Sequence, residues 1–289
     1  MIRHTPWILA ITLRFYRQIL LTNLRPMLKT VRARSYLPGL RIAQTPIQNS
    51  SVKNNSARSL SRSKENSLSH RHTYSRQHID QTDIDAVVDV LRSDYLTQGP
   101  MTEQFESALA AYTGARHAIA VNSATSALHL SMLATGITEN DCVWTTPNTF
   151  VATANAARMC GAEVRFIDID PGTLNLCPKV LSSALHEAAK THELPQAIVF
   201  VHFAGNPTGF SEVANVAKIF GVPVIEDGSH ALGSSISGVP VGSCTQSQAT
   251  VFSFHAVKPV TAGEGGIITT NDDQFAETVR LLRSHGVTR

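Results

Sequence analysis

The sequence has 289 residues, of which 43% are hydrophobic and 17 are glycine, and a chain of this kind can bury a sizeable α/β core. Its net charge of +3 is the sum of a basic part and an acidic part. The part up to Arg76 has 14 Lys/Arg and one acid, Glu65, whereas the remainder has 11 Lys/Arg and 21 Asp/Glu. Arg14 keeps the first apolar run too short for a bilayer, which excludes a membrane span there.

Residues 1–73 form a basic extension that is rich in Arg, Ser and Asn, and we expect it to be largely disordered. Its start, residues 7–17, is amphipathic and carries arginines, and it is similar to a mitochondrial presequence. The preferred alternatives are an extension without a targeting role and a wrongly assigned start of the chain. A basic tail this diffuse gives little support for nucleic-acid binding, so no nucleic-acid partner is predicted.

The globular part begins at residue 74 with helical patterns. Residues 80–91 start with cap-type residues and predict a helix that packs on the domain. Its apolar positions at helical spacing are Ile84, Val87, Val88 and Leu91. Residues 96–100 then break the chain sharply, and residues 103–112 predict a second helix.

Short apolar runs alternate with helical runs through the rest of the chain. The expected strands are 119–121, 143–146, 164–168, 197–201, 222–226, 249–257 and 265–270. This alternation implies an α/β fold with a mainly parallel seven-stranded sheet, right-handed crossovers and helices on both faces. The site residues should therefore converge along one edge of the sheet.

Lys258 follows the uncharged run 249–257, which predicts a buried strand that ends at the lysine. A primary amine in that position loses hydration of its ammonium form, which lowers its pKa and favours the free amine that condenses with an aldehyde. These properties suit Schiff-base chemistry. A solvated loop lysine is the alternative.

Asp227 ends another apolar strand, where a doubly wound sheet places its site residues. An acid at one strand end and a lysine at another suit pyridoxal 5'-phosphate, because the acid keeps the ring nitrogen protonated while the lysine holds the aldehyde. The alternative is a helix N-cap ahead of residues 228–230. A strand, a small-residue turn and a helix at residues 119–130 offer a phosphate site at the helix N-terminus, with Thr125 and Ser126 there.

The four cysteines show no close pair and no metal-type spacing, so we expect reduced thiols. They are Cys142, Cys160, Cys177 and Cys244. No HxxxH or CxxC arrangement lies near His202 or His255, and no metal site is predicted.

Five motifs in order resemble the DegT/DnrJ/EryC1/StrS sugar aminotransferases, a family of fold-type I pyridoxal-phosphate enzymes, over residues 74–289. The motifs are NSATSALHL (122–130), VWTTPNTFVATANAA (143–157), IEDGSHALG (225–233), VFSFHAVKPVTAGEGG (251–266) and RSHGVTR (283–289). NPTG at 206–209 is typical of aspartate-type aminotransferases, but the SFHAVK and LTQGP motifs belong to the sugar group, so we interpret NPTG as incidental.

The resemblance implies that Lys258 and Asp227 are catalytic and also hold the cofactor. It assigns Ser253, together with Thr125 and Ser126, to the cofactor phosphate.

The remaining implied roles each have an alternative. Phe150, next to Thr149, would stack on the pyridine ring, and an ordinary core phenylalanine is the alternative. His230 would meet the ring hydroxyl or phosphate region, with a capping histidine as the alternative. Thr97 and Gln98 would approach the substrate, although residues 96–100 could be only a turn between helices.

The family further implies transamination at C4 of a UDP-linked 4-keto-6-deoxy-N-acetyl-hexose with L-glutamate as donor, a homodimer and a cytoplasmic location. The sugar dehydratase branch is disfavoured because it replaces the lysine by histidine. Relatives continue into a small C-terminal domain that this sequence lacks, so residues 74–289 correspond to a truncated large domain. A catalytically inactive protein that binds the cofactor or a partner subunit is therefore the alternative function.

Overall fold

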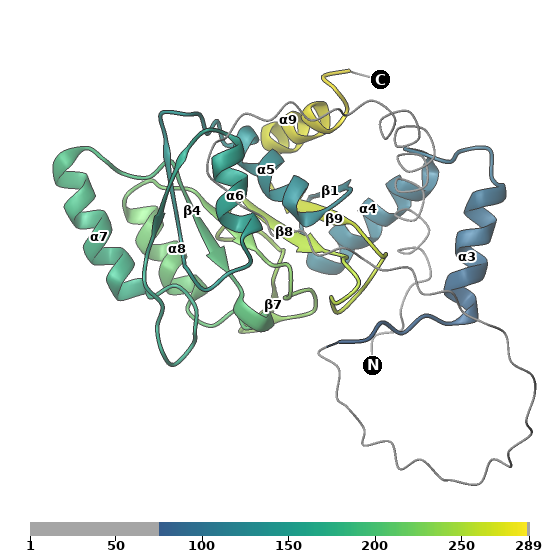
Figure 1. The fold of residues 1–289 in the computed structure, drawn as a ribbon, viewed down its shortest axis with the longest axis horizontal. Coiled ribbons are helices and arrows are strands. Elements are labelled where there is room, and N and C mark those ends of the chain that lie inside the picture. The colour runs from purple at the N-terminus through teal and green to yellow at the C-terminus, as the bar shows by residue number, and fades with distance from the viewer. Residues whose placement is uncertain (1–74, 288–289) are drawn as a thin grey trace, which may run out of the picture.

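The computed structural model describes residues 75–287. The predictions for residues 1–73, which include disorder and a presequence at residues 7–17, lie outside the described residues. The described part is an α/β fold with a seven-stranded sheet between helices (Figure 1). The predicted fold class is confirmed.

The sheet combines parallel strands with one reversed strand. Its strands are β1 (His117–Val121), β2 (Cys142–Thr145), β3 (Glu163–Phe166), β4 (Ala197–Val201), β5 (Val224–Asp227), β8 (Ala249–Ser253) and β9 (Gly266–Thr270). They lie in the order β1-β9-β8-β5-β4-β2-β3, and β9 runs antiparallel to both of its neighbours while the other pairs are parallel. A separate ribbon pairs β6 (Ser235–Ile236) with β7 (Val239–Pro240). β4, β5 and β8 therefore end at the same edge.

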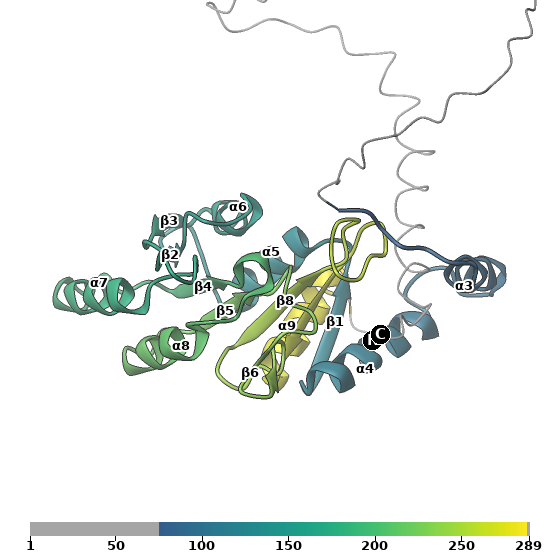
Figure 2. The same cartoon turned by 90° about the horizontal axis from the view of Figure 1, so that it is seen from below.

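Helices cover both faces, as alternate strand residues point to opposite sides. The helices are α3 (Gln81–Arg92), α4 (Pro100–Thr113), α5 (Ala124–Ala134), α6 (Ala152–Met159), α7 (Pro178–Thr191), α8 (Phe210–Ile219) and α9 (Asp273–Arg283), with a 3₁₀ turn η1 (Phe203–Gly205). Val199 and Ile225 belong to the core with α5, α6 and α9, whereas Ile198 and Phe200 belong to the core with α7 and α8. Figure 2 shows α6 and α8 on opposite sides of the strands.

Helix α3 begins where the sequence predicts, but its apolar face differs from the expected one. Asp80 caps it, because its side chain accepts the backbone N–H groups of Thr82 and Asp83. The Asp83 side chain in turn accepts the backbone N–H of Asp80. Val87 and Val90 are buried and pack on Met101 of α4. Ile84 and Leu91 remain 45% and 51% exposed, and α3 stands away from the sheet (Figure 1). The prediction that all four apolar residues face the domain is wrong for these two.

The strand that precedes Lys258 is shorter than expected. β8 ends at Ser253, the last residue that pairs with β9, through Gly266. Phe254 continues into the core, and the N–H of Lys258 donates to the carbonyl of His255 in a turn. Lys258 thus lies on the loop between β8 and β9 rather than at a strand end, because the register with β9 closes the pairing five residues earlier.

Three further properties concern the whole described part. All four cysteines are free, and burial raises the pKa of the Cys244 thiol to about 11. Between residues 75 and 287, no helix is both long and apolar enough to cross a membrane. No group of three or more His, Cys, Asp or Glu side chains in this range could hold a metal ion.

Candidate cofactor site

A cavity of about 370 Å³ opens at the edge where β4, β5 and β8 end. Six residues that the sequence assigns to the cofactor line it: Thr125, Phe150, Asp227, His230, Ser253 and Lys258. They come from four separate segments of the chain, around residues 125, 150, 227–230 and 253–258. The sheet therefore brings together side chains that the sequence keeps far apart.

Lys258 is half-buried in the wall of this cavity. Burial lowers the pKa of its ammonium group, and the carboxylate of Asp227 opposes this effect. The expected direction of the shift is confirmed, although a loop rather than a strand end provides the burial. A lowered pKa increases the share of free amine, which is the form that attacks an aldehyde.

Asp227 is the last residue of β5 and is only 5% exposed. Thr153 donates to its Oδ2 at 2.7 Å, and Ser229 donates to Oδ1 through its hydroxyl at 2.6 Å and its backbone N–H at 3.1 Å. No helix begins at residues 228–234, where the chain makes turns before β6. The N-cap alternative for Asp227 is therefore wrong.

His230 also lines the cavity. Its pKa is lowered by burial first and by the positive charge of Lys258 second, while Asp227 acts in the opposite direction. The imidazole is thus neutral near pH 7. Because no helix begins in this stretch, the capping alternative for His230 is wrong as well.

The N-terminus of α5 forms the end of the cavity where an anion would bind. Ser123, not Thr125 or Ser126, is its N-cap, and the Ser123 hydroxyl accepts the backbone N–H of Ser126 at 3.1 Å. Ser123 and Thr125 line the cavity, whereas Ser126 borders a neighbouring one. The predicted phosphate residues are therefore divided between two cavities.

Two more predicted residues complete the cavity wall. The Ser253 hydroxyl accepts the backbone N–H of His255 at 3.3 Å and carries a proton of its own. Phe150 is 75% exposed, so the alternative of an ordinary core phenylalanine is wrong. An exposed aromatic ring beside Lys258 can stack on a planar ligand.

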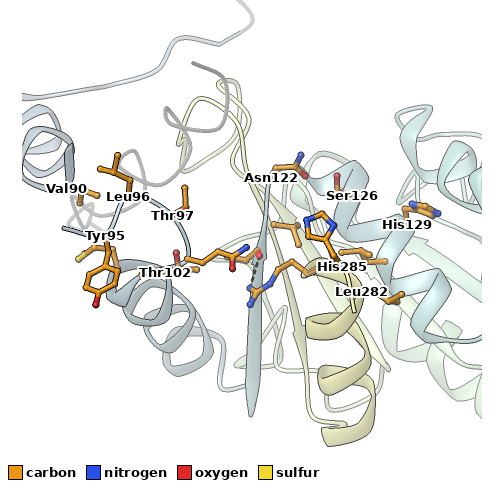
Figure 3. A pocket seen from close by; sticks show the side chains of 17 residues that line it. Val90, Tyr95, Leu96, Thr97, Thr102, Asn122, Ser126, His129, Leu282 and His285 are labelled. Carbon is orange, nitrogen blue, oxygen red and sulfur yellow. Dashed lines mark hydrogen bonds between the residues drawn. The ribbon is translucent and has the colours of Figure 1, made fainter. Parts of the chain in front are cut away.

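The neighbouring cavity, of about 410 Å³, contains the predicted substrate residues Thr97 and Gln98 (Figure 3). They come from the turn between α3 and α4, and Figure 3 shows Thr97 opposite Asn122 and His285. Gln98 has a positive φ of 49°, which fits a sharp turn. Thr97 and Gln98 thus do not line the cofactor cavity, and both cavities border the start of α5.

Comparison with known proteins shows the family of the chain. Residues 77–289 match the DegT/DnrJ/EryC1/StrS aminotransferase family. The chain belongs to this family. The UDP-4-amino-4,6-dideoxy-N-acetyl-beta-L-altrosamine transaminase of Campylobacter jejuni is 46% identical over 217 residues, which are 75% of this chain and 56% of that protein.

Solved structures agree with the family assignment. Helicobacter pylori PseC, an aminotransferase involved in the biosynthesis of pseudoaminic acid, has a TM-score of 0.69 and 37% identity, covering 75% of this chain and 57% of that one. Spr1654 of Streptococcus pneumoniae in its PLP-form has a TM-score of 0.68 and 29% identity, covering 76% and 59%. The chain thus spans a little more than half the length of these relatives.

In this DegT/DnrJ/EryC1/StrS family member, the sequence did not predict a role for some residues of the site. Gly266 is one, because a Cβ there would lie 2.5 Å from the carbonyl carbon of Ser123 and 2.6 Å from the nitrogen of Ala124. Only glycine lets β9 pass so close to the start of α5. Ser123 was not assigned a role either. Its position two residues after the end of β1, directly before the helix, is the sequence signal that could have identified it as the N-cap.

The family motifs also contain side chains to which the sequence gave no role. Glu264 of the GEGG segment faces His255 across 3.7 Å, and both line the cofactor cavity. NPTG forms a turn before α8, held by Asn175, which donates to the carbonyls of Asn206 and Thr208. It borders neither of the two cavities described above, which agrees with the interpretation that it is incidental.

Proposed function

We propose that this chain is the cofactor-binding part of a pyridoxal-phosphate-dependent aminotransferase that transfers an amino group from L-glutamate to C4 of a UDP-linked 4-keto-6-deoxy-N-acetyl-hexose. The observation that carries the proposal is the placement of Lys258, with its lowered pKa, and the buried carboxylate of Asp227 in one cavity. A half-buried amine and a buried acid are the two groups that the cofactor needs at opposite ends of its ring.

The residues of the cavity fit pyridoxal 5'-phosphate. When bound, this cofactor supplies an aldehyde that condenses with amines and a ring that accepts an electron pair. Lys258 would hold the aldehyde carbon and Asp227 the ring N–H. The N-terminus of α5, with Ser123 and Thr125, provides free backbone N–H groups for the phosphate.

Other side chains would orient the ring and exclude water. Phe150 would cover one face of the ring, and Ser253 would add a hydroxyl to the phosphate site. His230 is neutral and would face the ring hydroxyl or the phosphate region. Once released from the aldehyde, the Lys258 amine would take a proton from the substrate carbon and return it, and its lowered pKa favours the free-base form that this role requires.

The sugar-nucleotide part of the proposal rests on the relatives. The names of the Campylobacter and Helicobacter proteins refer to an amino-dideoxy sugar nucleotide and to pseudoaminic acid. The cavity with Thr97 and Gln98 and the cofactor cavity both border the start of α5, and we infer that the first would hold part of the sugar nucleotide. A homodimer in the cytoplasm completes the proposal, and nothing in the comparisons supports a mitochondrial location.

Borohydride reduction in the presence of pyridoxal 5'-phosphate, followed by peptide mapping, tests the central assignment. We expect the cofactor to be fixed to the peptide that contains Lys258, and to be lost from a Lys258→Ala variant. Lys218→Ala, on α8 away from the cavity, is the control and should be labelled like the wild type. Label on another lysine, or a folded wild type without label, would contradict the proposal.

Turnover is tested separately, because the relatives are longer than this chain. The assay is amination of a UDP-4-keto-6-deoxy sugar with L-glutamate. If cofactor binds without turnover, the alternative of a binding protein without catalysis of its own is favoured for this chain.

A further inference from the structure

A chain of hydroxyl groups leads from the cavity wall to Asp227. Thr149, which lines the cavity beside Phe150, has its Oγ1 2.7 Å from the Oγ1 of Thr153. Thr153 in the first turn of α6 is 1% exposed, and its Oγ1 lies 2.7 Å from Oδ2 of Asp227. On the other side, Ser229 donates twice to Oδ1.

The direction of this chain follows from counting protons. A hydroxyl has one proton, and an ionised carboxylate only accepts. Thr153 must therefore donate to Asp227, and it can only accept from Thr149. The bonds run from Thr149 to Thr153 to Asp227, and the Ser229 hydroxyl likewise gives its one proton to the carboxylate.

The same count limits what Asp227 can still bind. A carboxylate offers about four acceptor positions, and the hydroxyl of Thr153 with the hydroxyl and N–H of Ser229 occupies three of them. About one position then remains for a donor in the cavity. Because both oxygens are held, the side chain cannot turn that position away without breaking at least one bond.

We propose that Thr153 and Ser229 are positioning residues that fix the Asp227 carboxylate so that its remaining acceptor position meets the ring N–H of the cofactor. The inference rests on the proposed function, and it assigns a role to Thr153, which does not line the cavity, and to Ser229, which lines it and donates two bonds to the acid. Thr149 extends this hydrogen-bond network to the cavity wall, because its bond to Thr153 connects the segment that carries Phe150 with Asp227.

The test compares two ligands of the full chain, pyridoxal 5'-phosphate and its 1-deaza analogue, in which a carbon replaces the ring nitrogen. The variants are Thr153→Val, which keeps the shape but removes the hydroxyl, and Ser229→Ala. Thr145→Val is the matched control, because the Thr145 hydroxyl is also buried but donates to the carbonyl of Val199. Dissociation constants are measured by fluorescence titration.

For Thr153→Val and Ser229→Ala, we expect the dissociation constant of pyridoxal 5'-phosphate to rise about tenfold, because a hydrogen bond to a charged group is lost. Binding of the deaza analogue should stay nearly unchanged, since that ligand has no ring N–H to meet. Thr153→Ser should restore the wild-type value, and Thr145→Val should change neither constant. In an Asp227→Ala background, Thr153→Val should have no further effect.

Equal loss of affinity for the two ligands, or a Thr153→Val effect that persists without Asp227, would show a merely structural role and overturn the inference. Unchanged affinity for pyridoxal 5'-phosphate would overturn it as well. A wild-type chain that binds neither ligand would instead refute the proposed function, and the inference with it.

Discussion

Lys258 and Asp227 border the same cavity and act on each other through charge, since the Asp227 carboxylate raises the lysine pKa that burial lowers. The acid ends strand β5 and the lysine lies on the loop after β8, two neighbouring strands of the sheet. This pairing places an amine and a carboxylate in the wall of one cavity, where a planar cofactor would lie between them. Replacing either residue should therefore change properties that can be measured.

Replacing Asp227 by asparagine should leave the cofactor bound but slow transamination by orders of magnitude. The neutral amide no longer favours a protonated ring nitrogen, so the ring accepts electrons less well. Each factor of ten in rate corresponds to about 1.4 kcal/mol of barrier. Stopped-flow measurement of the half-reaction with L-glutamate checks this, and a near-normal rate would mean that another residue serves the ring nitrogen.

The lowered pKa of Lys258 predicts a pH-dependent stability of the cofactor-free protein. The unfolded chain binds more protons than the folded one between the lowered pKa and the ordinary value of 10.5, so stability rises with pH in that window. Lys258→Met should therefore stabilise the protein at neutral pH, and the gain should shrink as the pH approaches 10.5.

Urea unfolding of wild type and Lys258→Met at several pH values provides the measurement. Lys179→Met on α7, outside the cavity, is the control and should show no such trend. A constant difference between wild type and Lys258→Met at all pH values would mean that the effect is not electrostatic.

Gly266→Ala should damage the phosphate end of the site. The new Cβ would meet the backbone of Ser123 and Ala124 at 2.5 and 2.6 Å, so either β9 or the start of α5 must shift. Overpacking of this kind costs about 1 to 3 kcal/mol of stability. We also expect weaker binding of the cofactor phosphate, measured by titration with pyridoxal 5'-phosphate.

Gly172→Ala is a suitable comparison, because its Cβ would meet only the side chain of Asp170, at 3.1 Å. It should change affinity little. Full affinity in Gly266→Ala would show that the start of α5 is not the phosphate site.

The buried histidine His202 follows β4 and lines the cofactor cavity, and we expect it to contribute to stability through its bond to Glu226. Nε2 of His202 lies 2.7 Å from Oε2 of Glu226, whose other oxygen accepts from Ser247 and Thr250. Its Nδ1 has no protein partner among the described residues, and Nε2 donates its proton to the Glu226 carboxylate. His202→Ala would leave the buried carboxylate short of a donor, at a cost of about 3 kcal/mol.

Chemical denaturation measures this loss. The exposed pair of Glu187 and Lys190 is the control, since Glu187→Ala should change stability little. A His202→Ala variant as stable as the wild type would mean that water replaces the imidazole without loss.

The sequence by itself determined the fold class and the succession of strands along the chain, and it singled out Lys258 and Asp227, which line one cavity in the structure. Lys258 and Asp227 are conspicuous in the sequence because each follows a short apolar run, and such a run predicts a buried strand. The start of α3 was also predictable, because cap-type residues such as Asp80 bond to backbone groups only a few positions away.

Only the tertiary structure decided which side chains meet across those segments. The partners of Asp227 come from α6 and from the turn after β5, and no local pattern predicts that Thr153 reaches it. The need for glycine at 266 arises from the start of α5, far away in the chain. Local patterns reflect the preferences of neighbouring residues, whereas hydrogen bonds and close approaches between distant segments depend on the packing of the whole sheet, and that packing sets the geometry of the site.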